Sequence, residues 1–159
     1  MIEWKMDRSR KLWATREFYM RDATAYDWGE VLADWGASLI LCDPSVSEKE
    51  IVELRKKFGI NIRPAMSVRR WKARVEGWRT RLCIQQDGYP GVYISPDCPN
   101  LWNELLNLAY YIKKGSEEVE ESFAPGTLDH AWDAGAYGMS FFERGFIGAP
   151  RAPFELVRA

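Results

Sequence analysis

The segment ASLILCDP (residues 37–44) decides the fold class, because it joins an uninterrupted apolar run to a sharp stop. The run is too short for a helix, and its side chains suit a buried β-strand. Pro44 cannot continue a central strand, so the strand ends before it and leaves Asp43 at its carboxyl end. Ligands of α/β folds gather at the carboxyl ends of strands. Asp43 is therefore the first candidate site residue.

Strands and helices alternate on both sides of this segment. Capping boxes are predicted at Thr24 with Asp27 and at Ser47 with Glu50, and Gly36 and Gly59 are predicted to end the two helices. The alternation predicts an α/β domain with a mixed sheet, helices on both faces of it, and residues 39–42 inside it. The expected elements are a hairpin over 2–6 and 12–19, strands over 37–42, 60–65 and 88–95, and helices over 24–35, 47–58, 67–82, 99–112 and 128–144.

The remaining segments complete the expected domain. The helix over 67–82 carries an apolar stripe that should bury Trp71, Val75 and Trp78, together with Val68 and Leu82. Residues 113–126 are expected to form a polar acidic loop. Residues 1–145 are expected to form one domain, followed by an extended tail over residues 146–159.

Composition excludes several classes of protein. The 159 residues are 47% hydrophobic and 28% charged, which excludes a disordered tail and a collagen-like rod. No apolar run approaches the roughly 20 residues of a membrane helix, so no membrane is expected as a partner. The three cysteines are widely spaced and form no CxxC pair, which favours reduced thiols in a cytoplasmic protein.

The charges are unevenly distributed along the chain. Ten basic residues and a single acid lie between Arg55 and Arg81, whereas acids predominate from Asp97 to Asp133. This asymmetry suggests an anionic ligand near the basic segment and a metal near the acidic one, although both segments also fit solvated helix faces. The residues expected to contact a DNA backbone are Arg69, Arg70, Lys72 and Arg74.

A second group of candidate site residues opens the last predicted helix. At about 100° per residue, Asp129, His130 and Asp133 project from one face of its first turns. Divalent cations prefer carboxylate oxygens, and a two-metal site needs carboxylates from several elements. The alternatives remain open, because an acid is favoured at any helix start and an aspartate before proline is an ordinary turn residue.

Three segments, in the right order, resemble the C-terminal nuclease domain of the large terminase subunit of tailed bacteriophages. LILCDPSVSEKEI (residues 39–51) resembles that family's second acidic motif. TLDHAWDAGAYGM (residues 127–139) resembles its third motif, with Gly135 and Ala136 where leucine and arginine are usual. YISPDCPNLWNELLNLAYY (residues 93–111) resembles the strand and helix between them.

This resemblance implies a ribonuclease-H-like fold and an endonuclease that cuts concatemeric double-stranded viral DNA with two magnesium or manganese ions. It implies catalytic, metal-binding roles for Asp43 and Asp133, with His130 and Asp129 as further metal ligands. The implied partners are double-stranded DNA, the portal protein, the small terminase subunit and an ATPase motor domain. The implied location is the cytoplasm of a bacterial host.

One departure from the family concerns its first strand and first acidic motif, which match nothing in this chain. Glu3 and Glu17 on the hairpin are the alternatives for that acid. We therefore expect little cleavage by this chain alone. The other hypotheses are an inactive terminase fragment that contacts DNA or packaging partners, and another ribonuclease-H-like nuclease such as a Holliday-junction resolvase.

Overall fold

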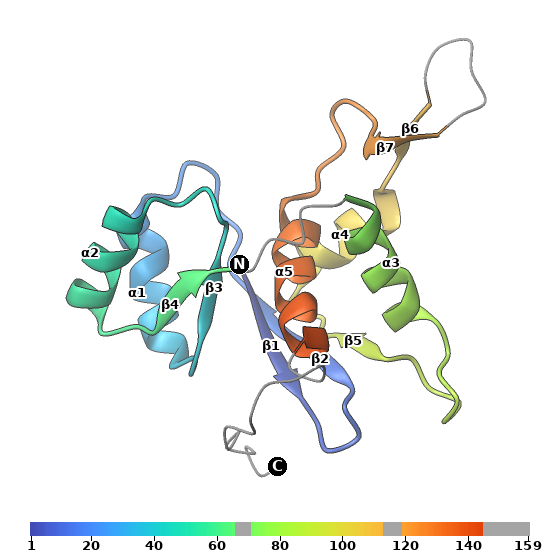
Figure 1. Cartoon of the computed structure of the whole chain (residues 1–159), viewed down its shortest axis with the longest axis horizontal. Helices are drawn as coiled ribbons and strands as arrows, with labels where there is room; N and C mark the ends of the chain where they lie inside the picture. The colour runs from blue at the N-terminus through green and yellow to red at the C-terminus, as the bar shows by residue number, and fades with distance from the viewer. Residues whose placement is uncertain (66–70, 113–118, 145–159) are drawn as a thin grey trace.

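The computed structural model describes residues 1–65, 71–112 and 119–144 of the chain (Figure 1). The chain is mixed α/β, as predicted, with helices packed around a small mixed sheet. Its elements are β1 (Ile2–Met6), β2 (Leu12–Glu17), α1 (Ala25–Trp35), β3 (Ile40–Cys42), α2 (Glu48–Phe58), β4 (Ile62–Pro64), α3 (Trp71–Leu82), β5 (Val92–Ile94), α4 (Pro99–Asn107), β6 (Tyr110–Ile112), β7 (Val119–Phe123) and α5 (His130–Arg144).

The ends of α1 and α2 follow local rules that the sequence displays. Thr24 and Ser47 form the predicted capping boxes with Asp27 and Glu50. Gly36 and Gly59 end the helices with φ of 62° and 66°, a left-handed conformation that glycine adopts without steric cost. These two helix boundaries are confirmed.

The strands of the described residues divide among three sheets. β1 and β2 form the predicted antiparallel hairpin, and β5 joins β2 in parallel. β3 pairs in parallel with β4, and β6 pairs with β7. The expectation that residues 39–42 lie inside one mixed sheet is corrected, because no described strand connects β1 with β3.

The region after α4 also differs from the prediction. The helix expected over 99–112 ends at Asn107, where Leu108 turns the backbone to an extended conformation. Residues 110–112 form β6, and Ile112 is 58% exposed. Aromatic and β-branched residues favour strands, which explains why this run leaves the helix. β7 lies within the segment expected to be a loop, and the Ala124 N–H donates to the Ala109 carbonyl (2.7 Å).

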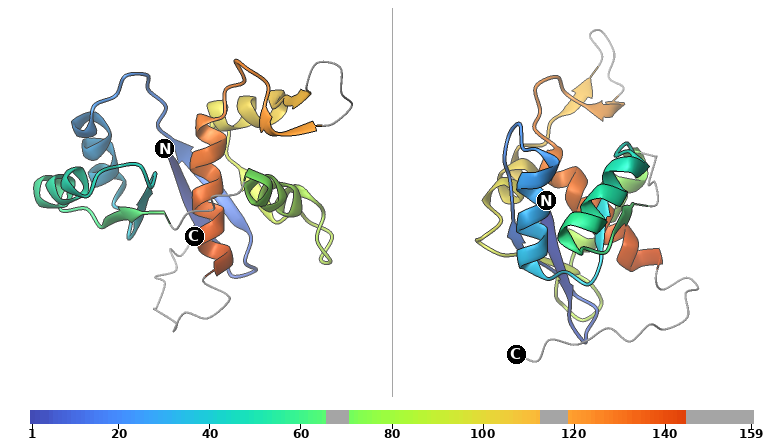
Figure 2. Two further views of the ribbon diagram at one scale, coloured as in Figure 1. Left: turned by 45° about the horizontal axis from the view of Figure 1, so that its top comes forward. Right: turned by 90° about the vertical axis from the view of Figure 1, so that its left-hand side faces the viewer.

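Two hydrophobic clusters hold the elements together. The first lies between the hairpin, β5 and the helices α3, α4 and α5, around the fully buried Trp132, Leu12 and Leu101. The second lies between α1, α2, β3 and β4, around Ile62, Ile51 and Leu54. In Figures 1 and 2, the α1–β3–α2–β4 group lies to one side of β1, and α5 runs alongside the hairpin.

Helix α3 packs tightly on α5 through a tryptophan and a glycine. Trp78 is 2% exposed, and its indole N–H donates to the Trp132 carbonyl (3.2 Å). A Cβ at Gly135 would lie 2.5 Å from the Trp78 ring, so only glycine fits there. The predicted burial of Trp78 is confirmed, and Trp71 and Val75 are half-buried, whereas Leu82 is 43% exposed at the helix end. Val68 lies outside the described residues.

Gly135→Ala is expected to destabilise the protein by about 1–3 kcal/mol, because the added methyl group overpacks the contact with Trp78. Gly77→Ala is the matched control, since nothing lies within 4 Å of a Cβ built at that position of α3. The control should be neutral or stabilising by up to about 1 kcal/mol. Urea unfolding measures both changes, and equal stabilities would contradict the close α3–α5 packing.

Candidate active site

Asp43 follows β3 directly, and two donors hold its carboxylate. The Ser45 N–H donates to Oδ1 (2.7 Å), and the Tyr137 hydroxyl donates to Oδ2 (2.8 Å). Tyr137 belongs to α5, the helix that also carries Asp133. The second hydrogen bond therefore connects the end of β3 with the helix that holds the other predicted carboxylate.

Asp133 lies in the first turn of α5, one turn before Tyr137. Arg74 on α3 places its Nη1 2.7 Å from Asp133 Oδ1, and the two side chains are 18% and 32% exposed. Among the described residues, neither Asp133 Oδ1 nor Arg74 Nε has a hydrogen-bond partner. The two side chains therefore form an ion pair that balances their charges, but its geometry gives neither Asp133 Oδ1 nor Arg74 Nε a hydrogen bond.

The two carboxylates have opposite pKa shifts. Burial raises the pKa of Asp133 above its ordinary value of 3.8, Arg74 opposes this rise, and Asp129 and Asp43 add to it. Hydrogen bonding by the Ser45 side chain is the largest cause that lowers the pKa of Asp43, against its partial burial. A neighbouring carboxylate disfavours ionisation, so Asp129 and Asp43 act on Asp133 in the same direction as its burial.

Burial raises the pKa of the Tyr137 hydroxyl to about 12, and its hydrogen bond to Asp43 adds to the rise. The tyrosine is therefore protonated at neutral pH. It serves as a hydrogen-bond donor to Asp43 rather than as a base.

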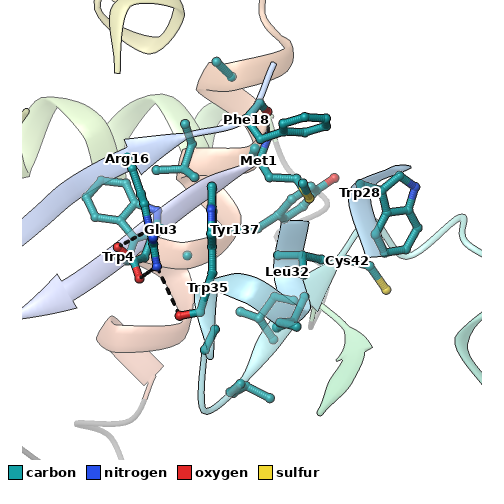
Figure 3. Close-up of a pocket in the computed structure, with 18 of the residues that line it drawn as sticks. Met1, Glu3, Trp4, Arg16, Phe18, Trp28, Leu32, Trp35, Cys42 and Tyr137 are labelled. Carbon is teal, nitrogen blue, oxygen red and sulfur yellow. Dashed lines mark hydrogen bonds and ion pairs between the residues drawn. The ribbon is translucent and has the colours of Figure 1, made fainter. Parts of the chain in front are cut away.

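Both carboxylates border a cleft of about 2500 Å³. The cleft is lined by β1, by α1, by the end of β3 and by one face of α5, and Figure 3 shows Trp35, Leu32, Cys42 and Tyr137 around it. The side chain of Arg16 on β2 extends towards α1. It pairs with Glu3 (3.0 Å) and donates to the Trp35 carbonyl (3.1 Å). These contacts connect the hairpin with α1.

The other predicted metal ligands lie near Asp133 without converging on it. His130 is the exposed first residue of α5, and Asp129 precedes the helix, where its carbonyl accepts from the Asp133 N–H (2.8 Å). Within the part of the chain that the structure describes, no group of three or more His, Cys, Asp or Glu side chains is arranged to hold a metal ion. Asp43 and Asp133 do not make a two-ion centre by themselves.

The two alternative acids of the hairpin have other partners. Glu17 accepts from the N–H groups of Asn100 (2.7 Å) and Leu101 (2.9 Å) at the start of α4. Glu3 accepts hydrogen bonds from Thr15 and Arg16. Both side chains therefore have structural roles, and the alternative in which either completes the metal site loses support.

The predicted DNA contacts fall on or just before α3. Lys72 is exposed on that helix, and Arg74 is the partner of Asp133. Arg69 and Arg70 lie outside the described residues. The structure thus gives Arg74 a contact that the charge pattern did not predict, and the DNA-binding assignment stays a prediction.

Tyr137 was not identified from the sequence, and Arg74 was predicted only as a DNA contact and not as the partner of Asp133. Tyr137 stands four residues after Asp133, so helical periodicity alone places both on one face of α5. That spacing was the available signal for Tyr137. No local pattern indicated the pairing of Arg74 with Asp133, because α3 and α5 are distant in sequence and come together only in the folded chain.

Comparisons of the chain with protein-family models, with curated proteins and with solved structures gave no match. A search of the described helices for one long and apolar enough to cross a bilayer was also negative. The functional conclusion therefore depends on the geometry of the site and on the sequence motifs.

Asp43→Asn and Asp133→Asn are expected to change stability in opposite directions at neutral pH. The lowered pKa of Asp43 means that its charged form stabilises the fold above the ordinary value of 3.8, and that this stability is lost as the pH falls through the folded-state pKa. Removing its charge should cost less than about 1 kcal/mol, because Asp43 is exposed and solvent screens its interactions. The raised pKa of Asp133 gives a contribution that is present below 3.8 and is lost as the pH rises through the folded-state pKa.

Asp133→Asn should therefore be neutral or stabilising at neutral pH, and its advantage should vanish in acid. Urea unfolding of both variants across the acidic and neutral range measures this. If Asp133→Asn were as destabilising as Asp43→Asn at neutral pH, Asp133 would be a structural partner of Arg74 rather than a strained site residue.

Proposed function

We propose that this chain is a metal-dependent endonuclease domain of the phage terminase type, with a ribonuclease-H-like arrangement of its elements, that acts on double-stranded DNA. One observation carries the proposal: Asp43 from the end of β3 and Asp133 from α5 border the same cleft, and Tyr137, one turn after Asp133, donates a hydrogen bond to Asp43 (2.8 Å). Like charges held together destabilise a fold, and such arrangements are typical of functional sites.

The position of the basic residues also supports an anionic substrate. α3 carries the exposed Lys72 and Arg79, and it packs directly on α5 beside Asp133. Lys72 and Arg79 lie on the exposed side of α3, whereas Arg74 and Trp78 face α5, so these two residues offer a surface for phosphate groups next to the site and not inside it. Lysine and arginine bind the backbone of DNA without reading its sequence.

The proposal assigns Asp43 and Asp133 as two carboxylates of a magnesium or manganese site. A terminase nuclease uses two ions. The described residues do not fit a two-ion centre, because they supply only the carboxylates of Asp43 and Asp133, and Arg74 is paired with Asp133. A further anionic ligand from outside the described residues is required. The portal, the small terminase subunit and an ATPase motor are the partners that the terminase assignment adds.

We expect this chain to bind Mn²⁺ weakly. We expect neither Asp43→Asn nor Asp133→Asn to bind it. Arg74→Met should strengthen Mn²⁺ binding by about tenfold or more, because it removes a competing positive charge from Asp133. Arg79→Met is the matched control, since Arg79 is exposed on the same helix. Titration followed by the paramagnetic resonance signal of free Mn²⁺ measures these affinities.

Plasmid nicking under the same conditions should be slight, should depend on Asp133, and should be at least as fast with Mn²⁺ as with Mg²⁺. Two results would contradict the proposal. One is Mn²⁺ binding that neither aspartate variant weakens. The other is strong nicking that survives Asp133→Ala, which would place the catalytic carboxylates elsewhere in the chain.

DNA binding is expected to weaken and to become less salt-dependent when Arg69, Arg70 and Lys72 are changed to alanine. Each phosphate contact releases counterions, so losing three contacts flattens the plot of log affinity against log salt by about 3 × 0.9. Changing Arg8, Lys49 and Lys56 to alanine alters the net charge equally at exposed positions elsewhere. Fluorescence anisotropy with a duplex measures the salt dependence of both triple variants. Identical slopes would mean that the basic segment does not contact DNA and only keeps the protein soluble.

A second candidate function is DNA or partner binding without cleavage. The observation that favours it is that both carboxylates already have protein partners, Asp43 with Ser45 and Tyr137, and Asp133 with Arg74. DNA binding that depends on α3, combined with no Mn²⁺ binding, would select this candidate.

A further inference from the structure

The edges of β1 and β3 border the same cleft, and each has backbone groups directed towards it. In the described part of the chain, β1 pairs only with β2 and β3 pairs only with β4. All residues of both strands line the cleft. An unpaired strand edge in a protein is a template for another strand.

The hydrogen-bond pattern identifies the backbone groups on the edge of β1. The Leu12 N–H donates to Gly91 (3.0 Å), and the Ala14 carbonyl accepts from Ser95 (2.9 Å), so both residues bond towards β5. Their partners in the antiparallel register with β1 are Met6 and Trp4. In such non-hydrogen-bonded pairs the backbone groups of the two residues point away from each other. The N–H and C=O groups of Trp4 and Met6 therefore lie on the open edge.

The same reasoning applies to β3. The Ile40 N–H donates to Asn61 (2.8 Å), and the Cys42 carbonyl accepts from Ala65 (2.8 Å) on the β4 side. Residues alternate in direction along a strand that pairs in parallel. The backbone groups of Leu41, which lies between them, are therefore directed to the opposite edge.

Helices form the other two walls of the cleft. Helix α1 contributes Trp28, Leu32 and Trp35, and helix α5 contributes Ala134, Tyr137 and Phe141. The space is thus bounded by two strand edges and by two helix faces, which are largely apolar apart from His130 and Asp133 at the start of α5 (Figure 3). A β-strand with helices on both faces is an almost continuous apolar run, rather than an alternating one.

We propose that this cleft binds an extended, uninterrupted apolar strand of a partner polypeptide, which pairs with β1 on one edge and with β3 on the other. The occupant follows from the walls: strand edges need an extended backbone, and helix faces on both sides need apolar side chains at successive positions. Its length matches β1, about 17 Å at roughly 3.3 Å per residue. Such a strand joins the two separate sheets into one. The proposal rests on the two strand edges and not on the carboxylates, although the strand would lie in the cleft that Asp43 and Asp133 also border.

The test uses the intact chain and a short synthetic peptide, KVIVIVK, whose lysines keep it soluble. Amide exchange followed by ¹⁵N NMR should show slowing of about tenfold or more at Trp4, Met6 and Leu41 together when the peptide is added. Amides on the exposed face of α2 serve as the internal control. The peptide KVIPIVK is the matched control, because its central proline lacks the N–H needed for pairing.

A second variant tests the edge of β3. Leu41→Pro removes an N–H that faces the cleft and leaves the bonds to β4 intact, so it should abolish the protection, whereas Leu41→Val should retain it. The peptide control keeps the test decisive if Leu41→Pro fails to fold. Protection at one edge only, or equal protection by both peptides, would overturn the proposal. Protection that rises with protein concentration in the absence of peptide would assign the cleft to a second copy of the chain and would also overturn it.

Discussion

The carboxyl group of Glu104 holds the start of α5 in place, and the candidate site depends on that position. Glu104 is 2% exposed, and it accepts hydrogen bonds from the Trp132 N–H (2.8 Å) and the Tyr19 hydroxyl (3.0 Å). The first N–H groups of a helix lack partners within the helix, so a buried acceptor there fixes where the helix begins. Asp133 is the next residue after Trp132, and its location follows from this contact. Glu17 plays the same role at the start of α4.

The other half of the site comes from a separate cluster. Asp43 follows β3, and β3 packs with α1, α2 and β4 around the second hydrophobic cluster. The contacts that join this cluster to the rest include Tyr137 with Asp43, Arg16 with the Trp35 carbonyl, and Arg63 with the ring of Phe141. The distance between the two aspartates therefore depends on these contacts between two separate hydrophobic clusters. A change in the width of the cleft would therefore change the distance between Asp43 and Asp133.

Local features of this fold were predictable from the sequence, and non-local ones were not. Capping boxes and terminal glycines depend on neighbouring residues, so the bounds of α1 and α2 were predicted correctly. The placement of Asp43 after a strand and of Asp133 on a helix follows from equally local patterns. Strand pairing depends on distant segments, and this is why a single mixed sheet was expected where β3 pairs only with β4 among the described strands. The pairing of Arg74 with Asp133 depends on how α3 packs on α5, which no local pattern encodes.

We propose that a divalent cation binds between Asp43 and Asp133, and a crystal structure of the chain with Mn²⁺ tests this most directly. Anomalous diffraction at the manganese edge locates the ion without reference to activity. The account predicts an anomalous peak within coordination distance, roughly 2.0–2.6 Å, of oxygens from both carboxylates, with Arg74 displaced from Asp133. Absence of a peak there, with the Arg74–Asp133 ion pair and the Tyr137–Asp43 hydrogen bond intact at saturating Mn²⁺, would contradict it.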